Sequence, residues 1–396
     1  MPASRTVVVA GAGIGGLAAA LTLAAKGFRV ALFESAERLE EVGAGIQLSP
    51  NASRILIALG LGDRLKPSVV VPQELIVRIA RTGEVLARAP LGTAVEARYG
   101  APYWVIHRAD LQAALRDAVV ATPDIELHLG TKVDEFATHD SGITVAASHR
   151  MDTVEERGIL LVCADGLWSR LRKRLGHDVA PRFAQHTAWR ALIPAEAAPA
   201  AFAEPAVNLW LGQNAHLVHY PVKGGALVNV VAILRDDWNE PGWSGPAARR
   251  DVLDRFSADR WQAPVRELLR ASRNWQKWAL FDCASFKDWG KGPVTLIGDA
   301  AHPMLPYLAQ GAAMAIEDAA VLGECLSRRR DDPTAAVRAY EGQRRSRTAR
   351  TQRAARMNGI VYHLGGNEML LRLLARFAMG EDKLIRRYDW LYGWKP

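Results

Sequence analysis

The sequence predicts an α/β fold in which a parallel sheet is interrupted along the chain by an inserted antiparallel sheet and is followed by helices. Three observations support this prediction. Residues 6–34 have the pattern of a strand, a tight glycine turn, a helix and a second strand. From about Arg182 to Ala279 the pattern changes to longer strands that carry tryptophans. At Val294–Gly298 a buried strand returns and helices follow it, so the first domain resumes after the insertion.

The opening segment has the pattern of a Rossmann-like dinucleotide-binding unit. An apolar strand, Val7–Ala10, meets Gly11, Gly13 and Gly16 in G-x-G-x-x-G spacing, and a helical pattern follows. The first glycine suits a tight turn, the second lets the backbone approach a pyrophosphate, and the third lets the helix pack closely on the strand. The helix N-terminus faces the phosphate charge. We therefore predict that this turn, including Gly15, binds a dinucleotide.

The second strand of the unit, Val30–Phe33, ends in Glu34. The acid lies about 20 residues after the turn, where a carboxylate can bond a ribose hydroxyl. The competing interpretation is a signal peptide or membrane anchor, because Arg5 precedes the uncharged run Thr6–Ala25. A secretory segment needs neither the glycine spacing nor the acid. We therefore expect a cytoplasmic dinucleotide-binding protein that does not enter a membrane.

Composition fits a globular protein of a reducing compartment. A chain of 396 residues can form a large core and two domains. Cys163, Cys283 and Cys325 lie far apart, with neither C-x-x-C nor metal-ligand spacing. We predict that these cysteines are packing residues and that the chain holds no metal.

The formal net charge of +8 raises the question of nucleic-acid binding. Much of the positive charge recurs every three residues on one predicted helix near the C-terminus, which we interpret as a solvated helix face. A basic surface of this kind also attracts anionic substrates and pyridine nucleotides, so we expect no nucleic acid as a partner. The residues concerned are Arg344, Arg345, Arg347, Arg350, Arg353 and Arg356.

The remaining elements follow from periodicity and turn signals. Helices are predicted at Asn51–Leu59, His107–Val120, Gln310–Leu326, Thr334–Met357 and Glu368–Met379. A hairpin is predicted from Leu75–Ala80 and Val85–Pro90, and further strands at Glu126–Leu129, Ile143–Ala147, Gly158–Cys163, Thr187–Ile193, Val207–Leu211, His216–Tyr220 and Ala226–Ile233. We therefore predict a discontinuous nucleotide domain (residues 1–74, 101–181 and 283–357), a substrate-binding sheet domain (75–100 and 182–282) and a C-terminal helical tail (358–396).

Two further motifs join the glycine turn. Cys163–Arg172 is a strand end followed by D-G-x-x-S-x-x-R, and Gly298–Pro303 reads GDAAHP before Ala309–Ala312 and Glu317–Ala319. In this order, over about residues 6–356, the three motifs resemble the FAD-dependent aromatic hydroxylases, which are single-component flavoprotein monooxygenases. The resemblance is strongest to the subgroup similar to salicylate hydroxylase, 3-hydroxybenzoate 6-hydroxylase and 6-hydroxynicotinate 3-monooxygenase.

The resemblance implies an FAD site. The glycine turn would hold the pyrophosphate, and Glu34 the adenosine ribose. Asp299, at the end of a buried strand, would bind ribityl hydroxyls. The helix that starts at Gln310 and Gly311 would stabilise negative charge on the N1–C2=O edge of the reduced flavin. The resemblance also assigns to this site Arg38, Gln47, Arg108, Leu129, Asp165, Pro306 and Ala312.

Simpler interpretations of these motifs stay open at the level of sequence. Asp165-Gly166 can be a plain turn, and Arg172 a surface charge rather than a residue shared between FAD and the nicotinamide. Asp299 can be a helix cap. The chain also has Ala312-Ala313 where many members of the broader family have G-Q-G-x-N, which leaves the polar contacts of this loop with the flavin open.

The resemblance implies a reaction as well. A single glycine motif fits a family in which NADH or NADPH binds transiently and leaves after hydride transfer. Reduced flavin would react with O2 to give a C4a-hydroperoxide, whose distal oxygen is transferred to an activated ring. The site must exclude water, because leakage gives hydrogen peroxide instead of product. A base near the substrate hydroxyl would make the ring more nucleophilic.

His216 and Tyr220 are the candidates for this part of the site. Residues two or four apart on a strand share a face, so these two side chains point the same way and His219 points oppositely. In the resembling hydroxylases a histidine and a tyrosine at this spacing lie beside the substrate. We predict His216 as base or hydroxyl partner, Tyr220 as a substrate contact and Tyr307 on the substrate side of the flavin. The alternative is a core or surface histidine and a packed tyrosine, and His302 is a weaker candidate base.

Together these observations predict an NAD(P)H-dependent FAD monooxygenase that is a monomer or a homodimer. Its substrate would be a small aromatic acid with an activating hydroxyl, a hydroxybenzoate ahead of a hydroxynicotinate or other hydroxypyridine. No single arginine identifies itself as the carboxylate-binding residue. The alternatives are a hydroxylase of a larger polycyclic scaffold and, outside catalysis, a flavin-binding sensor or scaffold.

Overall fold

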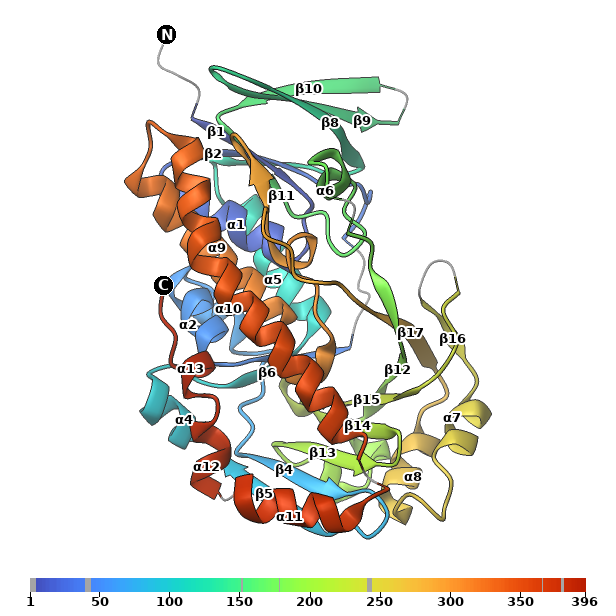
Figure 1. Cartoon of the computed structure of the whole chain (residues 1–396). Coiled ribbons are helices and arrows are strands. Elements are labelled where there is room, and N and C mark those ends of the chain that lie inside the picture. Colours follow the sequence, from blue (N-terminus) through green and yellow to red (C-terminus); the bar gives the residue numbers. More distant parts are fainter. Residues whose placement is uncertain are drawn as a thin grey trace.

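A computed structural model describes residues 5–39, 44–150, 152–177, 179–240, 244–364, 366–378 and 381–396. The fold has two main sheets with helices packed around them, and in Figure 1 the second sheet lies below the first. Within the described residues, no helix combines the length and the apolar character needed to cross a bilayer. The predicted α/β class is confirmed.

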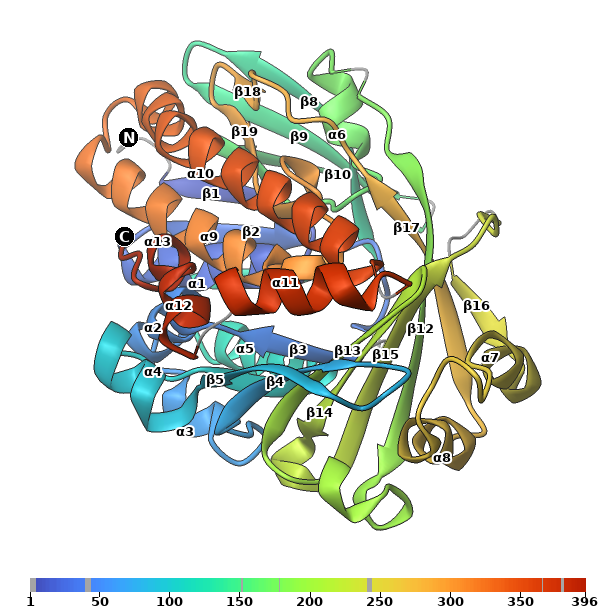
Figure 2. The same ribbon diagram turned by 60° about the horizontal axis from the view of Figure 1, so that its bottom comes forward.

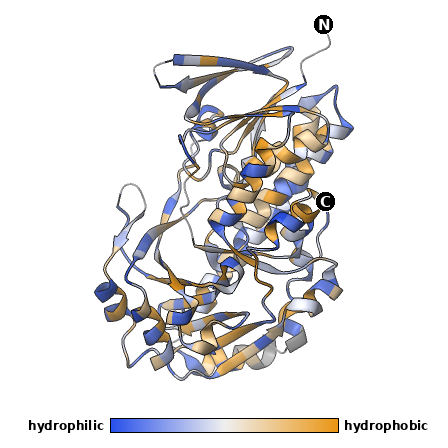
Figure 3. Cartoon of the chain, turned by 180° about the vertical axis from the view of Figure 1, so that it is seen from behind, coloured by the Kyte–Doolittle hydropathy of each residue, from blue (hydrophilic) through white to orange (hydrophobic). Residues whose placement is uncertain are grey.

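The central sheet has six strands in the order β18-β19-β11-β1-β2-β7, and only the β18–β19 pair is antiparallel. Distant parts of the chain meet in it: β1 (Thr6–Ala10), β2 (Arg29–Phe33), β7 (Ile125–His128), β11 (Leu160–Cys163), β18 (Gly290–Lys291) and β19 (Val294–Leu296). The apolar runs of β1 and β11 are fully buried, as expected for parallel strands covered on both faces. Hydrophobic residues follow these strands and the helices against them (Figure 3).

Helices cover this sheet. The helix α1 (Ile14–Ala25) packs against α5 (Arg108–Val120) and α9 (Gly311–Arg328), and α9 packs against α10 (Pro333–Tyr362). Figure 1 shows α10 running from the central sheet towards the second sheet. A three-stranded antiparallel sheet lies at the opposite end, formed by β8 (Thr131–His139), β9 (Gly142–His149) and β10 (Asp152–Gly158), the first and last of which were not predicted.

The second sheet has eight strands in the order β16-β17-β12-β15-β14-β13-β4-β5. Its strands are β4 (Glu74–Ile79), β5 (Val85–Pro90), β12 (Arg182–Pro194), β13 (Ala206–Gly212), β14 (Ala215–Val222), β15 (Leu227–Arg235), β16 (Ser244–Ala247) and β17 (Trp275–Asp282). The predicted hairpin, β4–β5, joins this sheet through a parallel β4–β13 pair, the one departure from antiparallel pairing. The outer face is covered by α7 (Arg249–Arg255) and α8 (Ala263–Ala271), which pack on Trp189, Trp210 and Trp275.

Short elements connect the two sheets. The strands β3 (Gly45–Leu48) and β6 (Trp104–His107) pair with each other between them. At the C-terminus, α11 (Glu368–Ala378) and α12 (Glu381–Arg386) pack on β5, followed by α13 (Asp389–Tyr392) (Figure 2). The other helices are α2 (Pro50–Ala58), α3 (Gly62–Leu65), α4 (Gly92–Tyr99) and α6 (Arg170–Arg174).

The arginine-rich helix corrects one prediction. Arg344 is 1% exposed, and its guanidinium donates to Glu317 at 2.5 Å and to Asp318 at 2.7 Å. Arg347 also pairs with Glu317, at 2.6 Å. The interpretation as a solvated face is therefore wrong for these two residues, because two adjacent acids on α9 attract them into the helix interface. Arg350 and Arg353 are exposed as predicted.

The three cysteines are confirmed as buried, free packing residues. No group of His, Cys, Asp or Glu side chains suited to a metal ion occurs in the part of the chain that the structure describes. The two main sheets take their strands from separate segments of the chain, but the predicted domain bounds remain predictions.

Candidate active site

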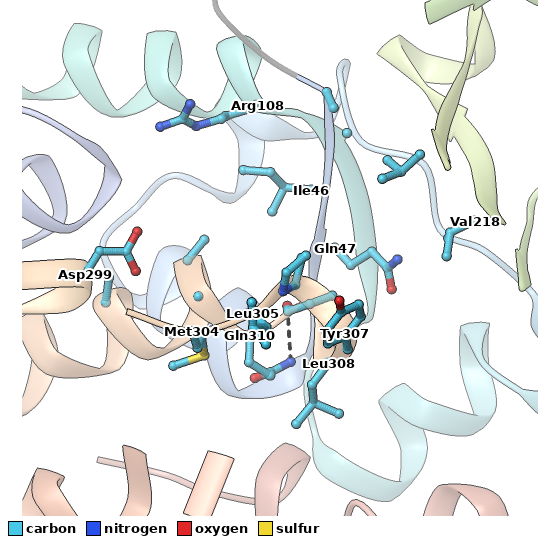
Figure 4. A pocket seen from close by; sticks show the side chains of 18 of the residues that line it. Ile46, Gln47, Arg108, Val218, Asp299, Met304, Leu305, Tyr307, Leu308 and Gln310 are labelled. Carbon is cyan, nitrogen blue, oxygen red and sulfur yellow. Dashed lines mark hydrogen bonds between the residues drawn. The ribbon is translucent and has the colours of Figure 1, made fainter. Parts of the chain in front are cut away.

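A cavity of about 520 Å³ lies between the central sheet and the inner face of the second sheet. Small-molecule and cofactor sites have volumes in this range. Figure 4 shows Asp299 and Arg108 on one side of it and Gln47 and Tyr307 on the other. The predicted site residues that line the cavity are Gly13, Gly15, Gln47, Arg108, His216, Tyr220, Asp299, Pro306, Tyr307, Gln310, Gly311 and Ala312.

The glycine turn is shaped as a cradle. Gly11 has φ +106°, and a Cβ there would lie 2.4 Å from the carbonyl oxygen of Ala164. A Cβ on Gly16 would lie 1.8 Å from the oxygen of Gly11, so this glycine lets the helix close on the turn. A Cβ on Gly13 would meet no atom within 4 Å, because that position opens on the cavity. The unpaired N–H groups that begin α1 thus face a space that suits a pyrophosphate.

Glu34 fixes the turn from the adjacent strand end. Its carboxylate accepts hydrogen bonds from the backbone N–H of Ala12 at 2.7 Å and of Ala36 at 2.9 Å. It lies beside the turn and outside the cavity lining, as do Arg38 and Leu129. Their predicted contacts with FAD remain predictions.

Asp299 faces the cavity from a turn that follows β19. Its side chain is open to the cavity but lies deep within the protein, and burial raises the pKa of its carboxyl, which the charges of His302 and Arg108 oppose. The loop that carries Asp299 has a positive φ angle near each of its ends, +57° at Gly298 and +52° at Ala309. α9 begins without a side-chain cap. The first N–H groups of α9 are therefore available to an anion, and a carboxylate beside them suits hydroxyl groups.

The side chain of Gln310 lies in a buried hydrogen-bond network, and the predicted contact of this helix start with FAD remains a prediction. Gln310 is 2% exposed, and its amide donates to the Ser49 hydroxyl at 2.9 Å and accepts from Asn51 at 3.1 Å. Asn51 also donates to Glu317 at 2.7 Å, which pairs with Arg344. The amide is thus part of a buried network that anchors the start of α9. Sequence reasoning missed this network, because its partners are about 260 residues apart.

In the second motif, Asp165 and Arg172 form hydrogen bonds within the protein. The Asp165 carboxylate accepts from the Ser169 hydroxyl at 2.6 Å and from the Leu171 N–H at 3.1 Å, at the start of α6. Arg172 is 1% exposed and donates to the carbonyls of Ala300 and Leu167, at 2.9 and 2.8 Å. Arg172 is therefore not a surface charge: it ties the 164–167 turn to the loop that carries Asp299. A direct FAD contact by Asp165 remains a prediction.

His302 belongs to a buried pair away from the cavity lining. Its Nε2 lies 2.5 Å from Asp318, and its side chain is 2% exposed. Burial alone raises the pKa of Asp318, but the charges of His302 and Arg344 outweigh it and hold this pKa low. The structure therefore supports a structural role for His302 rather than the weaker alternative of a base.

His216 and Tyr220 lie on the inner face of β14, while His219 faces outward against Phe202. Gly45 packs directly on the Tyr220 ring, because a Cβ there would lie 2.5 Å from its Cε2 atom. His216 is 2% exposed, and burial lowers its pKa well below the usual value. It is therefore neutral near pH 7 and can accept a hydrogen bond at its free ring nitrogen.

Two aromatic hydroxyl groups border the same space. The Tyr103 hydroxyl donates to Gln47 Oε1 at 2.6 Å, and the Gln47 side chain also hydrogen-bonds the Tyr220 hydroxyl, which partly offsets the rise that burial gives the pKa of that phenol. The Tyr307 hydroxyl is buried and has no hydrogen-bond partner among the described residues. Its ring centroid lies 5.5 Å from that of His216. The Tyr307 hydroxyl is therefore placed to meet a ligand.

Arg190 is a functional candidate that the sequence did not reveal. It lies on the inner face of β12 and lines the cavity, and its guanidinium lies 4.9 Å from the centroid of the Trp278 ring. It forms no ion pair with a described carboxylate, and its Nε has no partner there. Burial and the charge of Arg108 lower its pKa to about 10, so the group remains a cation near pH 7. The only sequence signal was a charge inside an otherwise apolar strand.

Comparisons with known proteins agree with this site. The family model described as "FAD binding domain" matches residues 4–355. The chain is 37% identical over 393 residues to a 3-hydroxybenzoate 6-hydroxylase of Polaromonas naphthalenivorans (strain CJ2), covering 99% of this chain and 97% of the relative. It is 34% identical over 365 residues to a 6-hydroxynicotinate 3-monooxygenase of Pseudomonas fluorescens, with coverages of 90% and 92%.

A solved structure with the same overall fold contains FAD. HpxO of Klebsiella pneumoniae, complexed with FAD and uric acid, superposes with a TM-score of 0.82 at 27% identity, covering 94% of this chain and 92% of that one. The cradle at the start of α1, the carboxylate of Asp299 and the uncapped start of α9 fit FAD as the cofactor, and NAD(P)H is typical of the hydroxylases of this family. The chain belongs to the FAD-binding-domain family and is an FAD-dependent aromatic hydroxylase.

Proposed function

We propose that this enzyme hydroxylates a small aromatic acid that carries an activating hydroxyl, a hydroxybenzoate ahead of a hydroxynicotinate, with NADH or NADPH as transient reductant and O2 as co-substrate. The observation that carries the proposal is that two polar groups lie on one apolar wall of the cavity. One is neutral His216, and the other is the cation of Arg190, which has no ion-pair partner among the described residues. These groups complement the two polar ends of such a substrate.

The strand register sets the distance between the two groups. His216 pairs with Ile233 on β15, which pairs with Ala188 on β12, so Arg190 lies two strands across and two residues along from His216. At strand spacings near 4.8 Å and a rise of about 3.4 Å per residue, the two Cα atoms are about 12 Å apart. Both side chains line the cavity, so a ligand held there can meet both groups.

The wall between them is apolar. Val218, Val231 and Ile233 fill the inner face of the sheet there, and Leu305 lies opposite. Exclusion of water limits the unproductive loss of activated oxygen as peroxide. Bound FAD, once reduced, supplies the oxygen-activating chemistry. Asp299 and the starts of α1 and α9 would hold it, and His216 would accept the hydrogen bond or proton of the substrate hydroxyl.

The names of the relatives support the same substrate class. One is a hydroxybenzoate hydroxylase and another a hydroxynicotinate monooxygenase, and both cover nearly the whole chain. A hydroxylase of a larger polycyclic scaffold is the second candidate, but the two relatives named above both act on single-ring acids by their names.

A substrate screen tests the proposal. The FAD-loaded enzyme is mixed with NADH or NADPH and, separately, with 3-hydroxybenzoate, 6-hydroxynicotinate, benzoate and a tricyclic phenol. We expect a hydroxybenzoate to stimulate reductant oxidation most and to yield a product heavier by one oxygen in mass spectrometry. Benzoate, which lacks the hydroxyl, should give little product. Preferential hydroxylation of the tricyclic phenol, or of no aromatic acid, would refute the proposal.

A further inference from the structure

Three histidines from three separate elements form a continuous chain behind the cavity wall. His216 Nδ1 lies 2.9 Å from His363 Nε2, and His363 Nδ1 lies 3.0 Å from His186 Nε2. His186 Nδ1 lies 2.7 Å from the carbonyl oxygen of Ala184. Only His216 lines the cavity, whereas His363, at the end of α10, and His186, on β12, are partly exposed. The chain therefore leads from the cavity towards the surface.

The hydrogen-bond partners fix the proton positions when all three rings are neutral. A carbonyl only accepts, so His186 Nδ1 carries a hydrogen and His186 Nε2 is an acceptor. It then follows that His363 donates from Nδ1 and accepts at Nε2, and that His216 donates from Nδ1. The lone pair on His216 Nε2 is left for the cavity. Each ring thus has the tautomer needed to receive a proton on the cavity side and pass one outward.

The surroundings explain why one histidine alone is a poor base here. Burial lowers the pKa of His216 well below its usual value, and burial lowers that of His363 to about 4. Among the described residues, no carboxylate bonds the three rings: Tyr307 and Tyr362 pack on His216, and Arg235 faces His186. A positive charge held on His216 would thus be costly. Burial also lowers the pKa of His186, but His186 is less buried than His216 and its Nδ1–H is bonded to the Ala184 carbonyl, which raises that pKa.

We propose that His216, His363 and His186 form a proton path that carries the proton of the substrate hydroxyl from the cavity to solvent. This inference rests on the proposed function, because it needs a hydroxyl-bearing substrate at His216. The hydroxyl O–H bond breaks and an N–H bond forms at His216 Nε2. His216 Nδ1–H then passes to His363 Nε2, and His363 Nδ1–H passes to His186 Nε2.

His186, now a cation, releases one proton to water, so one proton leaves for each hydroxyl ionised and no electron moves. Proton return along the same path, when the product hydroxyl forms, restores the original tautomers. His363 and His186 are positioning residues in this scheme, because they act on the substrate only through His216.

Proton release on ligand binding tests the path without turnover. The oxidised FAD enzyme is mixed in weak buffer, in a stopped-flow instrument, with 3-hydroxybenzoate and an indicator dye. Flavin absorbance follows binding and the dye follows the proton. Variants are His363→Phe, His363→Gln and, at the outer and less buried end, His186→Gln. His139→Phe is the matched control, since His139 is exposed and bonds only Ser141 and Thr144.

We expect the native enzyme to release a proton with 3-hydroxybenzoate and none with benzoate. In the His363 and His186 variants, release should slow at least tenfold, while FAD content and the Kd for benzoate stay unchanged. Added imidazole should partly restore the rate, and His139→Phe should behave as native. If 3-hydroxybenzoate binds and is hydroxylated but release is equally fast in all variants, the path is refuted and the proposed function stands. If 3-hydroxybenzoate neither binds nor reacts, both fail.

Discussion

Removal of the cation at position 190 should weaken the binding of aromatic acids selectively. In Arg190→Met the stem is kept and the charge is lost. A hydrogen bond to a charged group contributes about 1.5–3 kcal/mol, and 1.4 kcal/mol is a factor of ten in Kd. We therefore expect the Kd for 3-hydroxybenzoate to rise roughly tenfold to a hundredfold, with a smaller effect in Arg190→Lys.

The neutral amide of the same ligand provides the matched comparison. 3-Hydroxybenzamide has the same ring and hydroxyl but no anion, so its Kd should change less than threefold. Both values are measured by titration of the flavin absorbance at constant ionic strength. Because Arg190 has no ion-pair partner in the described protein, its loss should leave the thermal midpoint unchanged or raise it. Equal weakening of acid and amide would refute the assignment of Arg190 to the carboxylate.

Four further predictions concern the cofactor, the base, the anchoring network and pH. Asp299→Ala should lower FAD retention after gel filtration; a variant with full flavin absorbance would show that this carboxylate does not hold the cofactor. His216→Ala should keep FAD but slow hydroxylation or raise peroxide release per NAD(P)H oxidised, and unchanged coupling would remove His216 from the reaction. Arg344→Met should destabilise by about 3–5 kcal/mol in urea unfolding, because Glu317 and Asp318 lose a buried partner; a loss below 1 kcal/mol would contradict this. Burial lowers the pKa of His219 to about 3, so this residue stays neutral in the folded protein. In the unfolded chain it is protonated below about pH 6.5. The free energy of unfolding should therefore fall by up to about 1.4 kcal/mol per pH unit as pH falls from 6 to 4. His219→Gln should flatten the fall in unfolding free energy over this range, and an unaltered slope would be evidence against this assignment.

Local patterns predicted the parts of the fold that depend on local physics. The glycine turn, the first βαβ unit and the buried strand before Asp299 each follow from spacing and apolar runs, and the structure confirms them. Alternation on β14 also predicted correctly that His216 and Tyr220 share a face. These features follow from backbone geometry within about 30 residues, which the sequence contains directly.

What could not be predicted was the choice of partners between distant segments. Periodicity placed the C-terminal arginines on one helix face, but it did not show that Glu317 and Asp318 would bury Arg344. A lone charge in an apolar strand did not show that Arg190 would face a cavity with no ion-pair partner among the described residues. The contact of His363 with His216 spans 147 residues and depends on how far α10 extends beyond its predicted end at Met357.

The two polar groups of the cavity wall place complementary demands on a ligand. Burial of a guanidinium without a counter-ion in an apolar wall costs free energy, and a bound anion reduces this cost. A neutral histidine, held neutral by burial, accepts a proton only if the charge can be moved away from the wall. An aromatic acid with a hydroxyl on the same ring meets both demands at once, whereas an aromatic acid without the hydroxyl meets only the first. Selectivity for ring hydroxyls therefore depends on the histidine side of the cavity, and affinity for the anion on Arg190, so variants on the two sides should separate these properties.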